Sequence, residues 1–137
     1  FEDSGSAGVR LSIISSYRSF NVQKAVFNGW VSRLGQDEAV RVSAKPGSSQ
    51  HQLGTAIDFN MLDERFDATK EGIWLFQNSY KYGFVLSFPK NMEAYTGYRY
   101  EPWHYRYVGR DIAHIIHDYF DNNLEYFLNW YWFAGNK

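Results

Sequence analysis

The chain has 137 residues, of which 45% are hydrophobic and 21% are charged, a balance that fits one globular domain with its own core. It contains no cysteine, which excludes disulfides, thiolate metal ligands and cysteine nucleophiles. The net charge of -1, without a run of Lys or Arg, argues against a nucleic-acid-binding surface. No apolar stretch reaches the roughly 18–20 residues of a membrane span. Aromatic residues make up 20% of the chain and either fill the core or line a groove for carbohydrate or peptide.

The first part of the chain predicts a strand followed by two helices. Residues 11–15 form a short segment with β-branched Ile13 and Ile14, which favours a strand. Ser19 can cap a helix that ends at Gly35. The apolar positions of this helix recur at helical spacing and are Val22, Val26, Trp30 and Leu34. A second, short helix is expected over 37–43, and the turn residues of 45–49 predict a loop.

The rest of the chain alternates short strands with helices. The predicted strands are 55–59, 84–88 and 104–108. The predicted helices are a segment capped by Thr69 that continues to about Tyr82, a segment over 112–120, and a final apolar segment over 124–133. A loop is expected over 89–97. This pattern predicts an α+β fold, a single domain over 1–137 with a small antiparallel β-sheet flanked by helices.

His51 and Asp58 are metal-ligand residue types seven positions apart, and a mixed imidazole–carboxylate set suits zinc. On one straight strand this odd spacing would point the two side chains to opposite faces. Gly54 lies between them and lets the chain turn, so that both side chains can reach one point. Asp58 also lies among apolar neighbours, where an unpaired carboxylate is costly and a cation is a suitable partner.

Glu101 and His104 form a second candidate segment. His104 leads a predicted strand, and Glu101 precedes Pro102, where the backbone bends and lets the carboxylate approach the same site from a loop. A zinc ion with three protein ligands keeps an open position for water and lowers the pKa of that water to roughly 7. A neighbouring carboxylate can then take the proton during attack on a carbonyl.

Each of these residues has a simpler explanation when it is taken alone. His51 could be an ordinary surface histidine, and Asp58 could cap a turn or pair with an arginine. Glu101 could form a surface pair with Arg99 or Arg106. The order and spacing of the whole set favour the metal site.

The candidate residues fall into one ordered pattern, Ser49-x-His51-x-x-Gly54-x-Ala56-x-Asp58 followed by Glu101-x-Trp103-His104. This pattern resembles the signature of zinc D-alanyl-D-alanine carboxypeptidases, a group that includes vancomycin-resistance carboxypeptidases and L,D-carboxypeptidases. Lysostaphin-type peptidases and the hedgehog signalling domain belong to the wider group. The likeness runs from about residue 11 to 108, although Ser16 stands where the family often has Gly. It implies a hedgehog/D-Ala-D-Ala-peptidase-like fold.

The resemblance implies a role for each matching residue. Its zinc ligands are His51, Asp58 and His104, with Glu101 as the catalytic base. Arg18 would face the substrate, where a rigid guanidinium suits a C-terminal carboxylate or a developing oxyanion; alone, it could equally be a surface residue at a helix start. Ser49 would either donate to substrate or brace His51, and Trp103 would pack beneath the site or line it.

The implied activity is removal of a terminal D-alanine from peptidoglycan stem peptides by a monomeric zinc enzyme. Two alternatives stay open, an L-alanyl-D-glutamate endopeptidase of the same group and a zinc-stabilised binding module without turnover. The substrate implies an exported protein of the bacterial cell envelope. The chain begins with Phe1-Glu2-Asp3 and no Met, so we expect a processed or trimmed chain whose targeting or anchoring segment lies outside it.

Two further patterns are set aside. His114 and His117 have a spacing that can bind metal, but the helical period leaves both on the polar side of their helix, away from Ile112, Ile115 and Ile116. The aromatic stretch over 126–133 is expected to belong to the core or to pack on a segment outside the chain.

Overall fold

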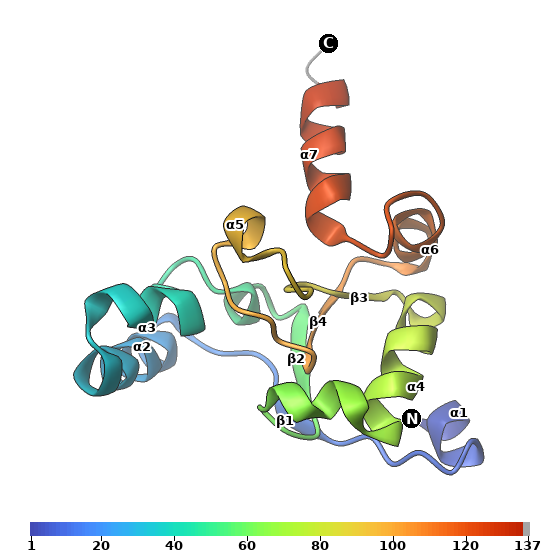
Figure 1. The fold of residues 1–137 in the computed structure, drawn as a ribbon, viewed down its shortest axis with the longest axis horizontal. Coiled ribbons are helices and arrows are strands. Elements are labelled where there is room, and N and C mark those ends of the chain that lie inside the picture. Colours follow the sequence, from blue (N-terminus) through green and yellow to red (C-terminus); the bar gives the residue numbers. More distant parts are fainter. Residues whose placement is uncertain (136–137) are drawn as a thin grey trace.

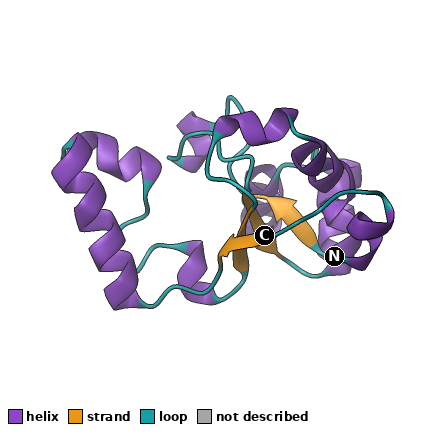
Figure 2. Ribbon diagram, turned by 90° about the horizontal axis from the view of Figure 1, so that it is seen from below, coloured by secondary structure: helices purple, strands orange, loops and turns teal. Residues whose placement is uncertain are grey.

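A four-stranded antiparallel sheet in the order β1-β2-β4-β3 forms the centre of the protein, with helices around it (Figures 1 and 2). The structure is a computed structural model and describes residues 1–135. The strands are β1 (Ile13–Ser15), β2 (Ala56–Phe59), β3 (Phe84–Leu86) and β4 (His104–Tyr107). The α-helices are α1 (Glu2–Ser6), α2 (Phe20–Leu34), α3 (Gln36–Val42), α4 (Lys70–Asn78), α5 (Glu93–Thr96), α6 (Arg110–Tyr119) and α7 (Leu124–Gly135). The predicted α+β fold is confirmed.

Two apolar clusters hold the helices on the sheet. The first lies under α4 and consists of Phe59, Phe66, Leu75, Leu86 and Tyr105. The second lies under α6 and the start of α7 and consists of Val85, Ala113, Ile116, Leu124 and Phe127. Burial of side chains of this size supplies most of the driving force for folding. The first cluster includes one residue from each of β2, β3 and β4, and the second includes Val85 of β3, so the sheet is anchored to the helices through these strands.

Helix α2 begins and ends as the sequence predicts. The Ser19 hydroxyl accepts a hydrogen bond from the Val22 amide, and Gly35 ends the helix with a φ of 80°. The apolar face of α2 differs from the prediction, because its buried residues are Gln23 and Phe27.

The predicted apolar positions of α2 are not core positions. Val22 and Leu34 are exposed, whereas Val26 and Trp30 line a cavity that separates α2 from the sheet. Figure 1 shows α2 and α3 beside each other and to one side of the sheet. The helical period alone could not distinguish a face that lines a cavity from one that packs in the core.

Several predicted boundaries shift in the structure. The helix expected to run to about Tyr82 becomes α4 plus a 3₁₀ turn, η3 (Ser79–Tyr82), and the predicted loop over 89–97 contains α5. Helix α1 has no counterpart among the predicted elements. Two more 3₁₀ turns, η1 (Gln50–Leu53) and η2 (Glu64–Ala68), lie in segments that flank β2.

Helix α7 projects away from the sheet (Figure 1). Its first turn is buried through Leu124 and Phe127, but the aromatic side chains of 130–133 are exposed. Of the two expectations for this stretch, a place in the core is therefore wrong for its distal half, and packing on a segment outside the chain stays a prediction. Within residues 1–135, no helix is both long enough and apolar enough to cross a membrane.

Helix α6 presents His114 and His117 outside the core, as predicted. Tyr80 packs against both rings: it stacks on His117 with the ring centroids 3.7 Å apart and meets His114 edge-on at 5.0 Å. Ile115, expected on the inward face, is 38% exposed.

Candidate functional site

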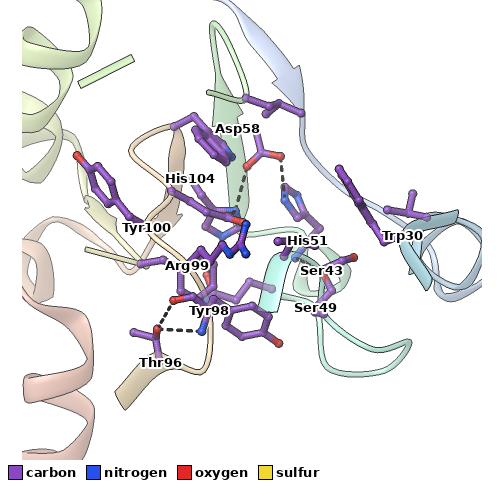
Figure 3. A pocket seen from close by; sticks show the side chains of 18 of the residues that line it. Trp30, Ser43, Ser49, His51, Asp58, Thr96, Tyr98, Arg99, Tyr100 and His104 are labelled. Carbon is purple, nitrogen blue, oxygen red and sulfur yellow. Dashed lines mark hydrogen bonds and ion pairs between the residues drawn. The ribbon is translucent and has the colours of Figure 1, made fainter. Parts of the chain in front are cut away.

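Three side chains predicted as metal ligands meet at one point. His51, Asp58 and His104 each offer one ligand atom, and these atoms all lie within 4.8 Å of one another. The two oxygens of Asp58 divide between the histidines: Oδ1 lies 2.9 Å from His104 Nδ1 and Oδ2 lies 3.2 Å from His51 Nε2. All three residues are 4% exposed. Figure 3 shows both imidazoles pointing at the carboxylate.

The local folding of three segments brings the cluster together. Asp58 and His104 are paired directly across the β2–β4 ladder. His51 lies in η1, which Ser49 caps by accepting a hydrogen bond from the His51 amide at 3.3 Å. Gly54 ends η1 in the left-handed conformation, with φ at 71°, and turns the chain into β2. The predicted turn at Gly54 is therefore what places His51 opposite Asp58.

The second ring nitrogen of each histidine is also occupied. His51 Nδ1 lies 2.6 Å from the Ser16 carbonyl oxygen, which can only accept, so this nitrogen carries the proton. His104 Nε2 lies 3.1 Å from Gln50 Oε1. Such outer partners orient the rings that bind metal in proteins. The nitrogens left facing Asp58 are Nε2 of His51 and Nδ1 of His104.

This donor set fits a zinc ion. Two imidazole nitrogens and one carboxylate oxygen match catalytic zinc sites. Donors about 2.0–2.1 Å from a tetrahedral zinc lie roughly 3.3 Å from each other, close to the 2.9 and 3.2 Å separations around Asp58. Three protein ligands also leave one position free for a water or a substrate oxygen.

Electrostatics favour an ionised Asp58 and a neutral His104. Burial alone would raise the pKa of Asp58, but its close contacts with His104 and His51 outweigh burial and lower this pKa to about 2. Burial lowers the pKa of His104, against the contact with Asp58 and the charge of its carboxylate. A carboxylate and a neutral imidazole are the protonation states that bind metal.

Glu101 lies beside the cluster, with Oε2 3.7 Å from His104 Nδ1. Its amide donates to the Phe88 carbonyl at 3.1 Å, which fixes the loop that carries it. Burial, followed by the charge of Asp58, raises the pKa of Glu101 to about 8, and Arg18 opposes this rise. Such a pKa lies near neutral pH, where a carboxyl group can both take and return a proton. The alternative of a surface pair with Arg99 is not realised, since Arg99 pairs with Glu38.

Arg18 approaches the cluster from the start of α2. Its Nη2 lies 3.8 Å from Asp58 Oδ2 and donates to Ser15 Oγ at 2.9 Å. Its Nη1 donates to Gln23 Oε1 at 2.8 Å. The fully buried Gln23 is held in turn by the Ala44 carbonyl, at 2.6 Å from its Nε2. The guanidinium is 18% exposed and is therefore presented to the cavity in a fixed orientation.

A cavity of about 610 Å³ contains all of these groups. Ser49 and Trp103, both predicted at the site, line it, and Trp103 also packs against the first apolar cluster. Figure 3 shows the metal-ligand cluster between Trp30 on one side and Tyr100 on the other. This volume lies within the range of about 300–1,000 Å³ that is typical of small-ligand sites.

Sequence reasoning missed two glutamines of this site. Gln23 orients Arg18, and Gln50 contacts His104. Gln23 is held by the Ala44 carbonyl, 21 positions away, and Gln50 contacts His104, 54 positions away, so no local spacing indicates them.

Known proteins resemble this chain in sequence. The model of the VanY D-alanyl-D-alanine carboxypeptidase family matches residues 1–110. The Bacillus subtilis protein YodJ is 43% identical over 124 residues, which are 86% of this chain and 45% of YodJ. The chain spans about half the length of the curated relatives it matches.

Solved structures of carboxypeptidases resemble this chain in fold as well as in sequence. The LdcB LD-carboxypeptidase is 43% identical with a TM-score of 0.85, covering 93% of this chain and 62% of that one. VanYB in complex with D-alanine-D-alanine is 34% identical with a TM-score of 0.82, covering 94% and 76%. A variant of a VanB-type VanY D,D-pentapeptidase in complex with Zn(II) is 33% identical with a TM-score of 0.75, covering 85% and 70%. With its fold, its cluster of ligand residues and a match over residues 1–110, this chain belongs to the VanY D-alanyl-D-alanine carboxypeptidase family.

Proposed function

We propose that this protein is a zinc-dependent carboxypeptidase that removes a terminal D-alanine from peptidoglycan stem peptides. The observation that carries the proposal is one cavity that holds a zinc-type ligand set, His51, Asp58 and His104, with Glu101 and Arg18 beside it. Family membership supports the same reaction class.

In this proposal a bound zinc ion and Glu101 have separate roles in hydrolysis. A zinc ion held by His51, Asp58 and His104 supplies Lewis-acid chemistry at the reacting carbonyl and acidifies water. Glu101 takes a proton from the attacking water and returns it to the leaving amine. Its position 3.7 Å from His104 Nδ1 and its raised pKa suit both transfers.

Arg18 recognises the end of the substrate. A carboxypeptidase must bind a free C-terminal carboxylate, and a guanidinium binds carboxylates through two parallel hydrogen bonds. Gln23 and Ser15 hold the guanidinium at the cavity, so little side-chain entropy is lost when substrate binds. Ser49 and Trp103 line the path of the peptide in this proposal.

The similar proteins differ in the peptide bond that their names indicate, an L,D bond or a D,D bond. LdcB, an LD-carboxypeptidase, is 43% identical, whereas VanYB, solved with D-alanine-D-alanine, is 34% identical. The higher identity favours the tetrapeptide stem, in which the terminal D-alanine follows an L-centre. The pentapeptide stem, which ends in D-alanyl-D-alanine, is the second candidate.

The experiment is incubation of zinc-loaded protein with defined tetrapeptide and pentapeptide stems, followed by mass analysis of the products. Loss of one alanine mass supports the proposal, and the stem that reacts faster identifies the bond. A cut between L-alanine and D-glutamate would indicate the endopeptidase alternative. Zinc binding without hydrolysis of any stem would indicate a binding module.

The substrate also determines where the protein would act. Stem peptides of the mature wall lie outside the cytoplasmic membrane, so we place the protein in the exported or envelope fraction. We expect a monomer and no nucleic-acid partner, because the net charge is -1 and the site lies within one chain. We also expect no cysteine-based partners, because the chain has no cysteine.

A further inference from the structure

Gln50 supports the candidate metal centre from the side opposite Asp58. Its Oε1 lies 3.1 Å from His104 Nε2 and 2.7 Å from Ser87 Oγ. Ser87, the residue after β3, is fully buried, and its amide donates to the His104 carbonyl at 3.2 Å. We propose that Gln50, held by Ser87, is a positioning residue that selects the tautomer of His104 able to bind metal.

The hydrogen-bond roles leave one consistent assignment. An amide oxygen only accepts, so both groups that face Gln50 Oε1 must donate. Ser87 supplies its hydroxyl proton, and His104 supplies the proton on Nε2. A neutral imidazole has a single ring proton, so Nδ1 keeps its lone pair. That lone pair faces Asp58, toward the centre of the cluster.

The opposite orientation of the amide would disable the site. If the amide nitrogen of Gln50 faced His104, it would donate to Nε2, and the ring proton would move to Nδ1. A protonated Nδ1 cannot bind a metal ion. In the structure the amide oxygen of Gln50, not its nitrogen, faces both Ser87 Oγ and His104 Nε2, which is the productive orientation.

The two histidines are therefore oriented by different means. His51 donates to the backbone carbonyl of Ser16, an acceptor that no substitution at Ser16 removes. His104 depends on a side chain, and a substitution at Gln50 can remove it. The inference rests on the proposed zinc chemistry but concerns metal affinity rather than the bond that is cut.

The test measures the dissociation constant for zinc by competition with a chromophoric chelator, in the absence of any peptide. Loss of such an outer partner costs about 10- to 100-fold in metal affinity. We expect this loss in Gln50→Leu and a smaller loss in Ser87→Ala. Gln50→Glu keeps an acceptor and should bind zinc at least as tightly as the wild type, because a charged acceptor strengthens the hydrogen bond. Gln77→Leu, the same change at an exposed position of α4, is the matched control and should be unchanged.

The rescue by Glu separates positioning from packing. If Gln50 merely filled space, replacement by Leu would leave zinc affinity unchanged and replacement by Glu would lower it. The unfolding temperature of each metal-free variant shows whether the substitution damages the fold in general. Zinc affinity of Gln50→Leu within about threefold of the wild type, or equal losses in Leu and Glu, would overturn the inference, as would a wild-type protein that binds no zinc. A protein that binds zinc with this pattern but hydrolyses no stem peptide would refute only the proposed function.

Discussion

Replacement of Gln23 by leucine tests how the protein holds its substrate-facing arginine. The Gln23 side chain is fully buried and makes three hydrogen bonds. It accepts from Arg18 Nη1 at 2.8 Å and donates to the Ala44 carbonyl at 2.6 Å and to Ser43 Oγ at 3.3 Å. Leucine has a similar size but can form none of them, so Gln23→Leu removes all three hydrogen bonds while an apolar side chain still fills the space.

The expected cost is dominated by the two shorter hydrogen bonds, to Arg18 and to the Ala44 carbonyl. A hydrogen bond to a charged donor contributes about 1.5–3 kcal/mol, and a carbonyl left without a partner costs about 1–3 kcal/mol. Arg18 can recover part of its loss from water in the cavity, because it is 18% exposed. We therefore expect a loss of about 3 kcal/mol, which lowers the melting temperature of a domain of this size by about 10 °C. The freed guanidinium should also lower kcat/KM by about 10-fold.

The assay is thermal unfolding of the metal-free protein together with steady-state kinetics on the preferred stem peptide. Gln23→Glu is the informative partner, because it keeps an oxygen for Arg18 but loses the donor to Ala44. It should be destabilised like the leucine variant yet retain more of the native kcat/KM. The reasoning is refuted if Gln23→Leu unfolds within about 2 °C of the wild type and keeps its kcat/KM, with exposed Gln77→Leu as the control.

Three further predictions concern the ligands, the substrate and the fold. Asp58→Asn should weaken zinc binding by more than the roughly 10- to 100-fold that loss of an outer partner costs, measured as zinc retained after gel filtration; full retention would argue that Asp58 is no ligand. Arg18→Lys keeps the charge but loses the two-pronged geometry, so kcat/KM should fall about 10- to 100-fold with zinc content unchanged; an unchanged KM would place the carboxylate elsewhere. Gly83→Ala forces a side chain at φ 87° with its Cβ 2.6 Å from the Tyr107 ring, which should cost about 2–4 kcal/mol and be visible in thermal unfolding; native stability would contradict this packing.

The clustering of His51, Asp58 and His104 could be predicted because its signal is short-range and ordered. His51 and Asp58 are close in sequence with Gly54 between them, and the structure uses that glycine to turn the chain. His104 and Glu101 form a second short segment that the β2–β4 ladder brings opposite Asp58. Residue type and order therefore carried most of the information about the ligands.

The supporting residues could not be predicted, because their partners are distant in sequence. Gln23 contacts Ala44, which is 21 positions away, and Gln50 contacts Ser87, which is 37 positions away. A polar residue on a helix gives no sign of which buried carbonyl or hydroxyl it will meet. Tertiary structure decides these contacts, and they in turn decide how Arg18 and His104 are oriented.

The buried face of α2 is a second feature that tertiary structure decides and the local sequence does not. Its helical period placed Val22, Val26, Trp30 and Leu34 on one apolar face, yet Val22 and Leu34 are exposed, and Val26 and Trp30 line the cavity. A wall of a binding cavity needs the same apolar residues as a core. Only the placement of α2 and α3 to one side of the sheet distinguishes the two (Figure 1).

The most direct test of the central claim measures zinc content and stem-peptide hydrolysis on the same preparation of Glu101→Gln. Glu101 contacts the ligand cluster at 3.7 Å but is assigned to proton transfer rather than to metal binding. The account predicts zinc bound as in the wild type and a kcat lower by about 100- to 10,000-fold. Hydrolysis at the wild-type rate with zinc still bound would contradict it.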